Sequence, residues 1–366
     1  MAPSTAGRLA RRLALAVERA WDSDRRSRFQ HDAADLRVVP YLGHGGPQGV
    51  VVRARVLHGA VPSDAVEGEH AWHAVRRTVA RFLTDEVPGV PVRVRVADHQ
   101  VETTSDAEGY VDVRLPGLPG ATGPWVEGVV EVPAGVLGRT TPLREPVEVR
   151  VPRPGEDLAL VSDVDDTVLE TGAQDLVTML RQTFTGSALT RSAVPGAPEL
   201  YRALVAGPDG RARRPVFYVS SSPWNLHGFL VAFLRRRRLP VGPLLLRDLL
   251  GDDPGRGHST TKTASVEEVL ALHPDLRVVL LGDTGQDDPQ IYADVVARHG
   301  ARVAAVYLRE VRLDPGDGRT EAALQGWPDD VPVLVADELA QTARHAADLG
   351  LLDAVRVADV EAAVAG

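Results

Sequence analysis

From residue 158 onward, short apolar runs alternate with segments of helical periodicity, and this alternation limits the possible folds more than any other feature. The apolar runs cover residues 158–162, 215–219, 244–246, 277–281, 302–307 and 331–335. The helical segments cover about 173–184, 197–206, the stretch that ends at 238, 261–272 and 288–299. Strands that alternate with helices predict a parallel sheet with helices on both faces. Pro332 in the last run predicts an edge strand, because proline lacks the N–H that a central strand needs.

The preceding residues show a different pattern, in which short strands are separated by glycine and proline. Strands are predicted over 48–57, 92–96, 110–115, 129–132 and 147–151, with a helix over 68–86. Gly43, Gly45 and Gly46 mark a turn before the first strand. Several short alternating strands are typical of a small β-sandwich. Residues 152–157 have the composition of a linker.

The first thirty residues have helical periodicity and carry seven arginines against three acidic residues. An amphipathic helix is predicted over 6–21. Its apolar face could lie on an anionic membrane surface, but packing against the next domain is the commoner arrangement. The apolar stretch 13–17 is too short for a secretion signal, so we expect a cytoplasmic protein, with peripheral membrane contact as the open alternative.

The predicted organisation is therefore a helix over 1–30, a β-sandwich-like domain over 31–152 and an α/β domain over 157–366. A chain of 366 residues is long enough for two domains. The absence of cysteine excludes disulfides, cysteine-ligated metals and a cysteine nucleophile. A net charge of −9 argues against a nucleic-acid partner, and no apolar run approaches the roughly 18 residues that span a bilayer.

Polar segments follow three of the strands predicted in the α/β domain. They are Asp-Val-Asp-Asp-Thr at 163–167, Ser-Ser-Ser-Pro at 220–223 and Gly-Asp-Thr-Gly-Gln-Asp-Asp at 282–288. Lys262, the only lysine of the chain, lies at the start of the helix that leads into the strand over 277–281. In open α/β sheets ligands bind beyond the carboxyl ends of the strands, so we expect these four segments to converge on one edge of the sheet.

The acids of these segments are suited to phosphoryl transfer. One carboxylate can attack phosphorus and form an aspartyl-phosphate, while a second protonates the leaving oxygen and later activates water. Asp163 and Asp165 are the candidates for these two roles. Mg²⁺ prefers oxygen ligands, and Asp283 and Asp288 can complete a set with them. The predicted metal site therefore contains Asp163, Asp165, Asp283 and Asp288.

The remaining residues of the pattern can hold the phosphate and the turn. Thr167 can steady the turn after the first strand. Ser220 can donate to a phosphoryl oxygen, with Ser221 or Ser222 as alternatives. Lys262 can hold the nucleophile and the phosphate together electrostatically. We therefore predict catalytic roles for Thr167 and Lys262 beside the two acids, and phosphate binding by Ser220, Ser221 and Lys262.

In this order and spacing, the four segments resemble the haloacid dehalogenase-type phosphatases. A closer resemblance, over 158–310, is to the catalytic-domain family of the actin-patch phosphatidate phosphatases. It is carried by residues 162–169, 217–226, 244–248 and 281–292. The resemblance implies a Rossmann-like parallel sheet and Mg²⁺-dependent conversion of phosphatidate to diacylglycerol.

The same resemblance assigns the roles of the acids: Asp163 is the nucleophile and Asp165 is the acid/base. Asp288 fits the family spacing better than Asp287, which remains the second choice for the last acid. Thr284 stands where serine is common in this family. No departure from the family pattern replaces a residue that has a catalytic role, so an active phosphatase is expected.

Loop lengths leave no room for a large cap domain over the predicted site. Roughly fifty residues separate the first two polar segments and roughly forty separate Ser220 from Lys262, and predicted helices and a strand account for both stretches. An open site favours a bulky or surface-held phosphate ester, such as that of a lipid or a macromolecule. The alternatives are a soluble phosphatase for another phosphomonoester, or a non-enzymatic scaffold whose β domain binds a protein partner of unknown kind.

Overall fold

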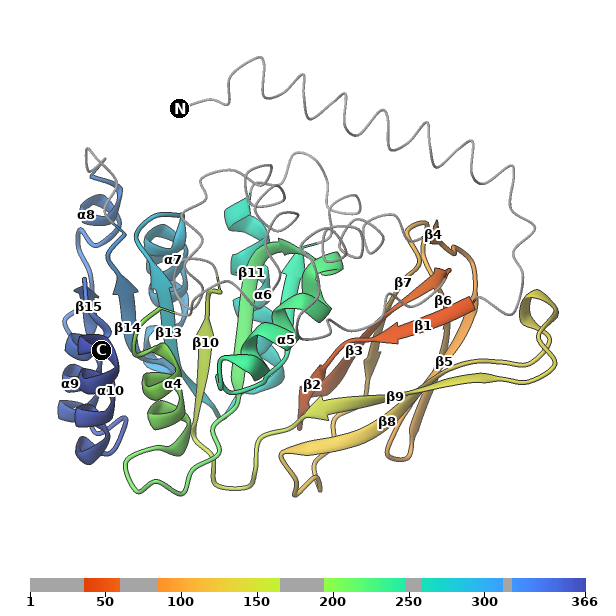
Figure 1. The fold of residues 1–366 in the computed structure, drawn as a ribbon, viewed down its shortest axis with the longest axis horizontal. Coiled ribbons are helices and arrows are strands. Elements are labelled where there is room, and N and C mark those ends of the chain that lie inside the picture. Colours follow the sequence, from red (N-terminus) through yellow and green to blue (C-terminus); the bar gives the residue numbers. More distant parts are fainter. Residues whose placement is uncertain (1–35, 60–84, 165–193, 248–257, 312–317) are drawn as a thin grey trace, which may run out of the picture.

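The computed structural model describes residues 36–59, 85–164, 194–247, 258–311 and 318–366. These residues form a mixed α/β protein with two sheets (Figure 1). One sheet is parallel and is covered by helices, and the other curls around its own apolar core. The predicted α/β class is therefore confirmed at this level.

The parallel sheet has the strand order β12-β11-β10-β13-β14-β15. Its strands are β10 (Leu158–Ser162), β11 (Val216–Pro223), β12 (Leu244–Arg247), β13 (Arg277–Asp283), β14 (Val303–Arg309) and β15 (Val333–Ala336). The six predicted strands match these elements to within a few residues. β15 lies at an edge of the sheet, as Pro332 predicts.

The helices of this half are α4 (Ala197–Ala206), α5 (His227–Arg236), α6 (His258–Leu272), α7 (Asp288–His299), α8 (Arg319–Ala323), α9 (Leu339–Asp348) and α10 (Val357–Ala365). Short 3-10 turns, η3 (Trp224–Leu226), η4 (Gly300–Arg302) and η5 (Ala354–Arg356), precede or follow them. The predicted stretch ending at 238 stops at Arg236, and Arg238 has a positive φ of 58°.

The apolar run of β10 is buried on both of its faces. Leu158 and Leu160 belong to the core under α4, α5, α9 and α10, whereas Ala159 and Val161 belong to the core under α6 and α7. Successive side chains of a strand point to opposite faces, and a strand covered on both sides must be apolar throughout. This explains why β10 shows no hydrophobic alternation.

The other sheet contains nine described strands, in the order β1-β3-β2-β9-β8-β5-β6, with β4 and β7 paired to β3. They are β1 (Leu36–Pro40), β2 (Gly43–Gly46), β3 (Gly49–His58), β4 (Asp85–Glu86), β5 (Pro91–Val96), β6 (His99–Thr104), β7 (Tyr110–Leu115), β8 (Trp125–Val132) and β9 (Leu143–Arg150). A short 3-10 turn, η2 (Val136–Gly138), connects the last two.

Three expectations for this half need correction or stay unconfirmed. The predicted β-sandwich is not confirmed, because hydrogen bonds join all nine strands into one sheet. The turn predicted before the first strand is present at Pro47 and Gln48, but Gly43, Gly45 and Gly46 lie in the buried strand β2 that leads into it, which pairs with β3 and β9. The last two residues of the helix predicted over 68–86 form β4 instead, because they pair with the end of β3.

Several predictions fall outside the described residues. They are the helix over 6–21, most of the helix over 68–86, the helix over 173–184, and the positions of Asp165 and Thr167. Within the described ranges, every helix is too short or too polar to cross a membrane.

Candidate active site

The strand order of the parallel sheet contains a topological switch point between β10 and β13. From β10 the chain continues to β11 and β12 on one side, and then crosses back to β13 on the other side. Open α/β sheets bind ligands outside the carboxyl ends of the strands at such a point. Asp163 follows β10 and Asp283 ends β13, so these two aspartates flank the switch point.

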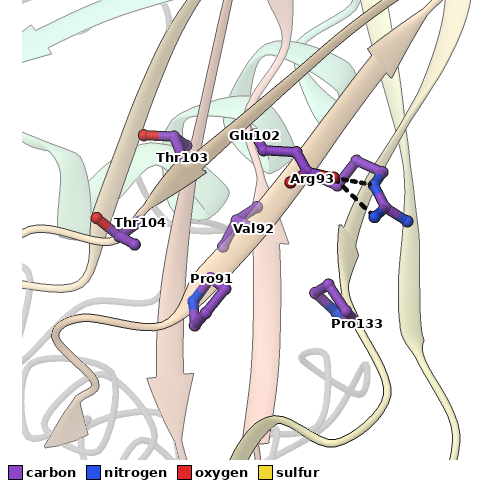
Figure 2. Close-up of a pocket in the computed structure, with 7 residues that line it drawn as sticks. All are labelled: Pro91, Val92, Arg93, Glu102, Thr103, Thr104 and Pro133. Carbon is purple, nitrogen blue, oxygen red and sulfur yellow. Dashed lines mark hydrogen bonds and ion pairs between the residues drawn. The ribbon is translucent and has the colours of Figure 1, made fainter.

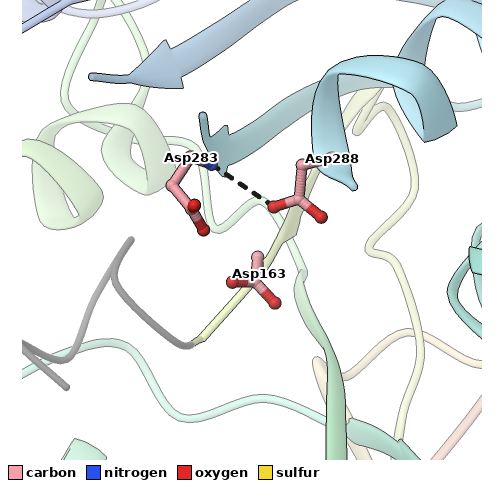
Figure 3. Close-up of side chains that lie close together, drawn as sticks. All are labelled: Asp163, Asp283 and Asp288. Atoms are coloured by element: carbon pink, nitrogen blue, oxygen red, sulfur yellow. Dashed lines mark hydrogen bonds between the residues drawn. The ribbon is translucent and has the colours of Figure 1, made fainter. Parts of the chain in front are cut away.

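Three aspartates gather at this place (Figure 3). Asp163, Asp283 and Asp288 each offer a carboxylate oxygen within 4.8 Å of the others. Their side chains are buried, with 1 % or less of the residue surface exposed. The N–H of Asp163 donates to the carbonyl of Leu281 at 2.8 Å, which ties the end of β10 to β13. Buried carboxylates this close together require compensating positive charge.

Lys262 supplies part of that charge. Its Nζ lies 2.7 Å from Asp163 Oδ1 and 2.6 Å from Asp288 Oδ1. Burial alone would lower the pKa of Lys262, but the two carboxylates outweigh burial and raise the pKa above its ordinary value. The lysine is therefore a fixed ammonium that bridges two of the three acids.

The two-residue period of β10 determines which acids can meet this lysine. Ala159 and Val161 face α6 and α7. Asp163 continues the same alternation and therefore points toward the helices that carry Lys262 and Asp288. Ser162 points to the opposite face, where its hydroxyl lies 2.5 Å from the hydroxyl of Tyr201 on α4.

Glycine allows α7 to begin directly over the end of β13. A Cβ on Gly282 would lie 2.6 Å from Asp288 Oδ2 and 2.7 Å from Cε2 of Tyr292. The N–H of Gly285 donates to Asp283 Oδ1 at 2.6 Å, and the N–H of Asp283 donates to Asp288 Oδ2 at 3.3 Å. The two close approaches to a Cβ explain why position 282, near the end of β13, is a glycine.

Asp288 and Asp287 have different surroundings. Asp288 is fully buried and contacts Lys262. The side chain of Asp287 is 52 % exposed and lies 3.5 Å from Nη1 of Arg319. The structure thus brings Asp288 into the acid cluster and leaves Asp287 at the surface.

The predicted phosphate-binding serines lie on the neighbouring strand. Ser162 pairs with Tyr218 in the parallel register, which places Ser220 two residues further, at the same edge of the sheet as Asp163. Ser220 is buried, and its Oγ accepts the N–H of Ser222 at 3.0 Å. Ser221 is half-buried. Asp165 and Thr167 lie outside the described residues.

Two tyrosines support the cluster without having been singled out in the sequence. Tyr201 contacts Ser162, whose hydroxyl donates to the carbonyl of Asp163 at 2.6 Å. The hydroxyl of Tyr292 donates to the carbonyl of Leu281 at 2.7 Å. Both lie on helices among apolar residues, so their sequence surroundings are those of ordinary core positions.

The donor set fits a hard divalent cation. Three buried carboxylates converge, and Lys262 compensates one of their charges. Carboxylate oxygens are the ligands that Mg²⁺ prefers, and it is commonly bound by one or two of them together with substrate phosphate. Asp163, Asp283 and Asp288 could therefore hold Mg²⁺ beside a phosphate ester.

A hollow of about 300 Å³ lies elsewhere, on β5 and β6 of the other sheet (Figure 2). Pro91, Pro133 and the Arg93–Glu102 ion pair are among the residues that line it. Its lining contains none of the predicted site residues. The chemistry of the molecule therefore points to the acid cluster and not to this hollow.

A known family matches the part of the chain that carries this site. Residues 158–310 match the family model described as the catalytic domain of phosphatidate phosphatase APP1. The matched part runs from the first residue of β10 to just beyond β14. It therefore contains the three polar segments of the site and Lys262.

Two curated relatives are similar over limited regions. An uncharacterised protein of Schizosaccharomyces pombe is 26 % identical over 160 residues, which are 43 % of this chain and 26 % of that protein. Phosphatidate phosphatase APP1 of Saccharomyces cerevisiae is 25 % identical over 248 residues, which are 62 % of this chain and 39 % of that protein. The chain thus spans well under half the length of either relative.

Among solved structures, a carbohydrate acetylesterase from Xanthomonas citri aligns over 78 % of this chain and 73 % of its own, at 13 % identity. The TM-score of 0.25 is too low to indicate a common fold.

Proposed function

We propose, from the match of residues 158–310 to the family model of the phosphatidate phosphatase APP1 catalytic domain, that the chain is a Mg²⁺-dependent phosphatase that acts through an aspartyl-phosphate. Phosphatidate, converted to diacylglycerol, is the substrate we favour. The observation that carries the proposal is the pairing of Lys262 with Asp163 and Asp288 at the switch point of the sheet.

The proposed reaction begins at Asp163. Its carboxylate attacks phosphorus, the new bond gives an aspartyl-phosphate, and the bond from phosphorus to the alcohol oxygen breaks. Asp165, assigned by the family resemblance, gives its proton to that oxygen. Asp165 then takes a proton from water as the water attacks phosphorus, which releases phosphate and restores Asp163.

Charge is the obstacle that the remaining residues address. Lys262 Nζ, 2.7 Å from Asp163 Oδ1, holds the nucleophile and can contact a phosphoryl oxygen at the same time. Bound Mg²⁺ would supply further positive charge against the acids and the phosphate. Asp283 and Asp288 would hold the ion together with Asp163. Ser220 or Ser221 would donate to the phosphoryl group from β11. Fixed charges of this kind account for most of the catalysis of phosphoryl transfer.

We also propose that the parallel sheet has the Rossmann-like, haloacid dehalogenase-type fold without a large cap. Its strand order and the position of the acids at the switch point support this assignment. A lipid substrate would require contact with a membrane surface, and the basic residues 1–30 are the candidate for that peripheral contact.

The experiment compares phosphate release from phosphatidate in mixed micelles with release from a water-soluble aryl phosphate. Wild type, Asp163→Asn and the control Asp294→Asn are each assayed with Mg²⁺ and with chelator. Asp294 is an exposed residue of α7 that does not belong to the acid cluster, and its carboxylate accepts a hydrogen bond from Gln290. The proposal expects lipid turnover well above aryl turnover, lost in Asp163→Asn and with chelator but kept in the control.

The other outcomes separate the alternatives. Turnover of the aryl ester alone would retain the chemistry and replace the lipid by a soluble phosphomonoester. Release from neither substrate by folded wild-type protein would contradict the phosphatase and favour a scaffold. Vesicle co-sedimentation with and without residues 1–30 tests the membrane contact separately.

A further inference from the structure

Glu268 on α6 is the centre of a charge cluster that joins the two halves of the molecule. Its carboxylate accepts hydrogen bonds from both terminal nitrogens of Arg53 on β3, at 3.0 and 2.8 Å. Arg114 on β7 donates at 2.7 Å, and Nε2 of His44 on β2 lies 3.1 Å away. The side chain of Glu268 is only 11 % exposed. A buried carboxylate in a bidentate pair with arginine is held in a defined geometry.

The backbone of the β-rich half also lies directly against α6. A Cβ on Gly46 would come within 2.6 Å of the carbonyl oxygen of Leu272, the last residue of the helix. A Cβ on Gly49 would lie 3.2 Å from Cδ2 of the same leucine. Such close approach leaves little freedom for the end of α6 to shift relative to β2 and β3.

A second contact of the same half reaches the serine segment. Tyr41, which follows β1, stacks on Trp224 with the ring centroids 4.6 Å apart and the planes inclined by 20°. Its ring also packs against His227 at 4.5 Å. Trp224 comes directly after Pro223, the last residue of β11. The β-rich half therefore contacts α6, which carries Lys262, and η3, which directly follows the strand that carries Ser220.

Lys262 and Glu268 belong to one continuous helix, six residues apart. At 1.5 Å per residue, their backbones are separated by about 9 Å along a rigid rod. A clamp on Glu268 therefore fixes the position of Lys262 as well. We propose that Glu268 is a positioning residue, through which Arg53, Arg114 and His44 of the β-rich half hold the Lys262 ammonium between Asp163 and Asp288.

On this proposal the β-rich half is part of the catalytic unit and not only an attached binding module. The expected effect on turnover rests on the proposed function. The expected effect on the position of Lys262 does not. That placement can be measured without any substrate, because Lys262 is the only lysine of the chain. An amine-acylating reagent therefore modifies one side chain, and the α-amino group of the chain serves as the reference.

The experiment measures the rate of Lys262 acylation by peptide mass spectrometry in wild type, Glu268→Gln and Glu267→Gln. Glu267 is a matched control, since it is the preceding residue on α6 and also pairs with an arginine and a histidine. Those partners, Arg298 and His299, lie at the end of α7 in the α/β half, so the ion pairs of Glu267 join two helices of that half.

Reagent reaches a buried amine mainly through local opening, so loosening α6 should accelerate the reaction. We expect Lys262 in Glu268→Gln to be acylated about ten-fold faster or more, and in Glu267→Gln at the wild-type rate. Turnover should fall by about ten- to a hundred-fold in Glu268→Gln through kcat, with KM nearly unchanged, because the reacting groups are misplaced.

An acylation rate in folded Glu268→Gln within about two-fold of wild type would overturn the proposal, whatever the enzyme activity. If Glu268→Gln does not fold, Arg114→Gln carries the test, since the side chain of Arg114 is 62 % exposed and its loss is milder. It should show a smaller acceleration in the same direction, and an unchanged rate would again be contrary. A wild type without phosphatase activity would contradict the proposed function and leave this measurement decisive.

Discussion

Two buried histidines predict that the protein loses stability in mild acid. His227 packs between Tyr41 and Trp224, and His273 packs between His44 and Phe217. Both are more than nine-tenths buried.

Burial lowers the pKa of His227 from 6.5 to about 4. For His273 burial is the main cause, with smaller contributions from His44 and two arginines, and the pKa falls to about 3. Nε2 of His227 and both ring nitrogens of His273 have no hydrogen-bond partner among the described residues.

The sign of the effect follows from proton binding. Above pH 6.5 both histidines are neutral in the folded and in the unfolded chain, so they contribute no pH dependence. Between pH 6.5 and their folded pKa values, the unfolded chain binds protons that the folded protein excludes. Stability then falls as the pH falls, by about 1.4 kcal/mol per pH unit for each histidine. From pH 7 to pH 5 this amounts to about 2 kcal/mol each, or about 4 kcal/mol together.

The assay is urea unfolding at pH 7.0 and pH 5.0, followed by tryptophan fluorescence. Wild type should lose stability by the amount above, with a further loss in the same direction from His44, whose pKa is lowered by burial against the opposing effect of Glu268. His273→Phe keeps an aromatic ring in the same place and should lose about 2 kcal/mol less between the two pH values. Equal free energies of unfolding at both pH values, or an unchanged difference in the variant, would refute the reasoning.

Three further predictions concern the acid cluster and the contact between the two halves. Lys262→Met should lower kcat by about a hundred- to a thousand-fold, since it removes a preorganised charge from the reacting atoms, and steady-state kinetics on the preferred substrate measures this. Asp288→Asn should raise the Mg²⁺ concentration for half-maximal activity by about ten-fold or more, whereas Asp287→Asn should leave it unchanged in the same titration. Gly46→Ala should destabilise the protein by about 1–3 kcal/mol in urea unfolding, because the new Cβ meets a backbone carbonyl at 2.6 Å, while Gly120→Ala, where a Cβ meets nothing within 4 Å, should not.

The α/β half was largely predictable from sequence because its signals are local. Each strand of the parallel sheet is a compact apolar run, and burial on both faces makes that run continuous. The site residues follow these runs, so the rule that ligands bind at the carboxyl ends of parallel strands brought Asp163, Asp283 and Lys262 together in advance. The preference for Asp288 over Asp287 came from the spacing of the family that the sequence resembles, and the structure adds the physical difference between them: Asp288 contacts Lys262, whereas Asp287 is exposed.

The β-rich half was less predictable because its strands pair over long distances and its glycines have two possible meanings. Gly43, Gly45 and Gly46 have the composition of a turn, yet they form β2. A Cβ on Gly45 would lie 2.6 Å from Cγ2 of Val50, and one on Gly46 would strike the end of α6. Glycine is required here by close approach between elements, which a single sequence cannot distinguish from a need for turn geometry.

The charged residues at the contact between the two halves were unpredictable from the sequence for a similar reason. Arg53 and Glu268 are 215 positions apart in the sequence. Nothing local distinguishes them from the other charged residues of the chain, and only the packing of β3 against α6 brings them together. The positioning role proposed for Glu268 could therefore not have been reached from the sequence.

The use of lysine at position 262 and of arginine beside Glu268 has a geometric explanation. Lys262 is the only lysine among 41 basic residues. At Glu268 a planar guanidinium fits, because Arg53 offers two parallel N–H groups to one carboxylate and its Nε to Asp112. In the acid cluster one nitrogen must bridge carboxylates of two different residues within 2.7 Å of each. A compact ammonium on a flexible stem meets that requirement and a rigid fork does not, so the residue that departs from the composition of the chain is the one whose position demands it.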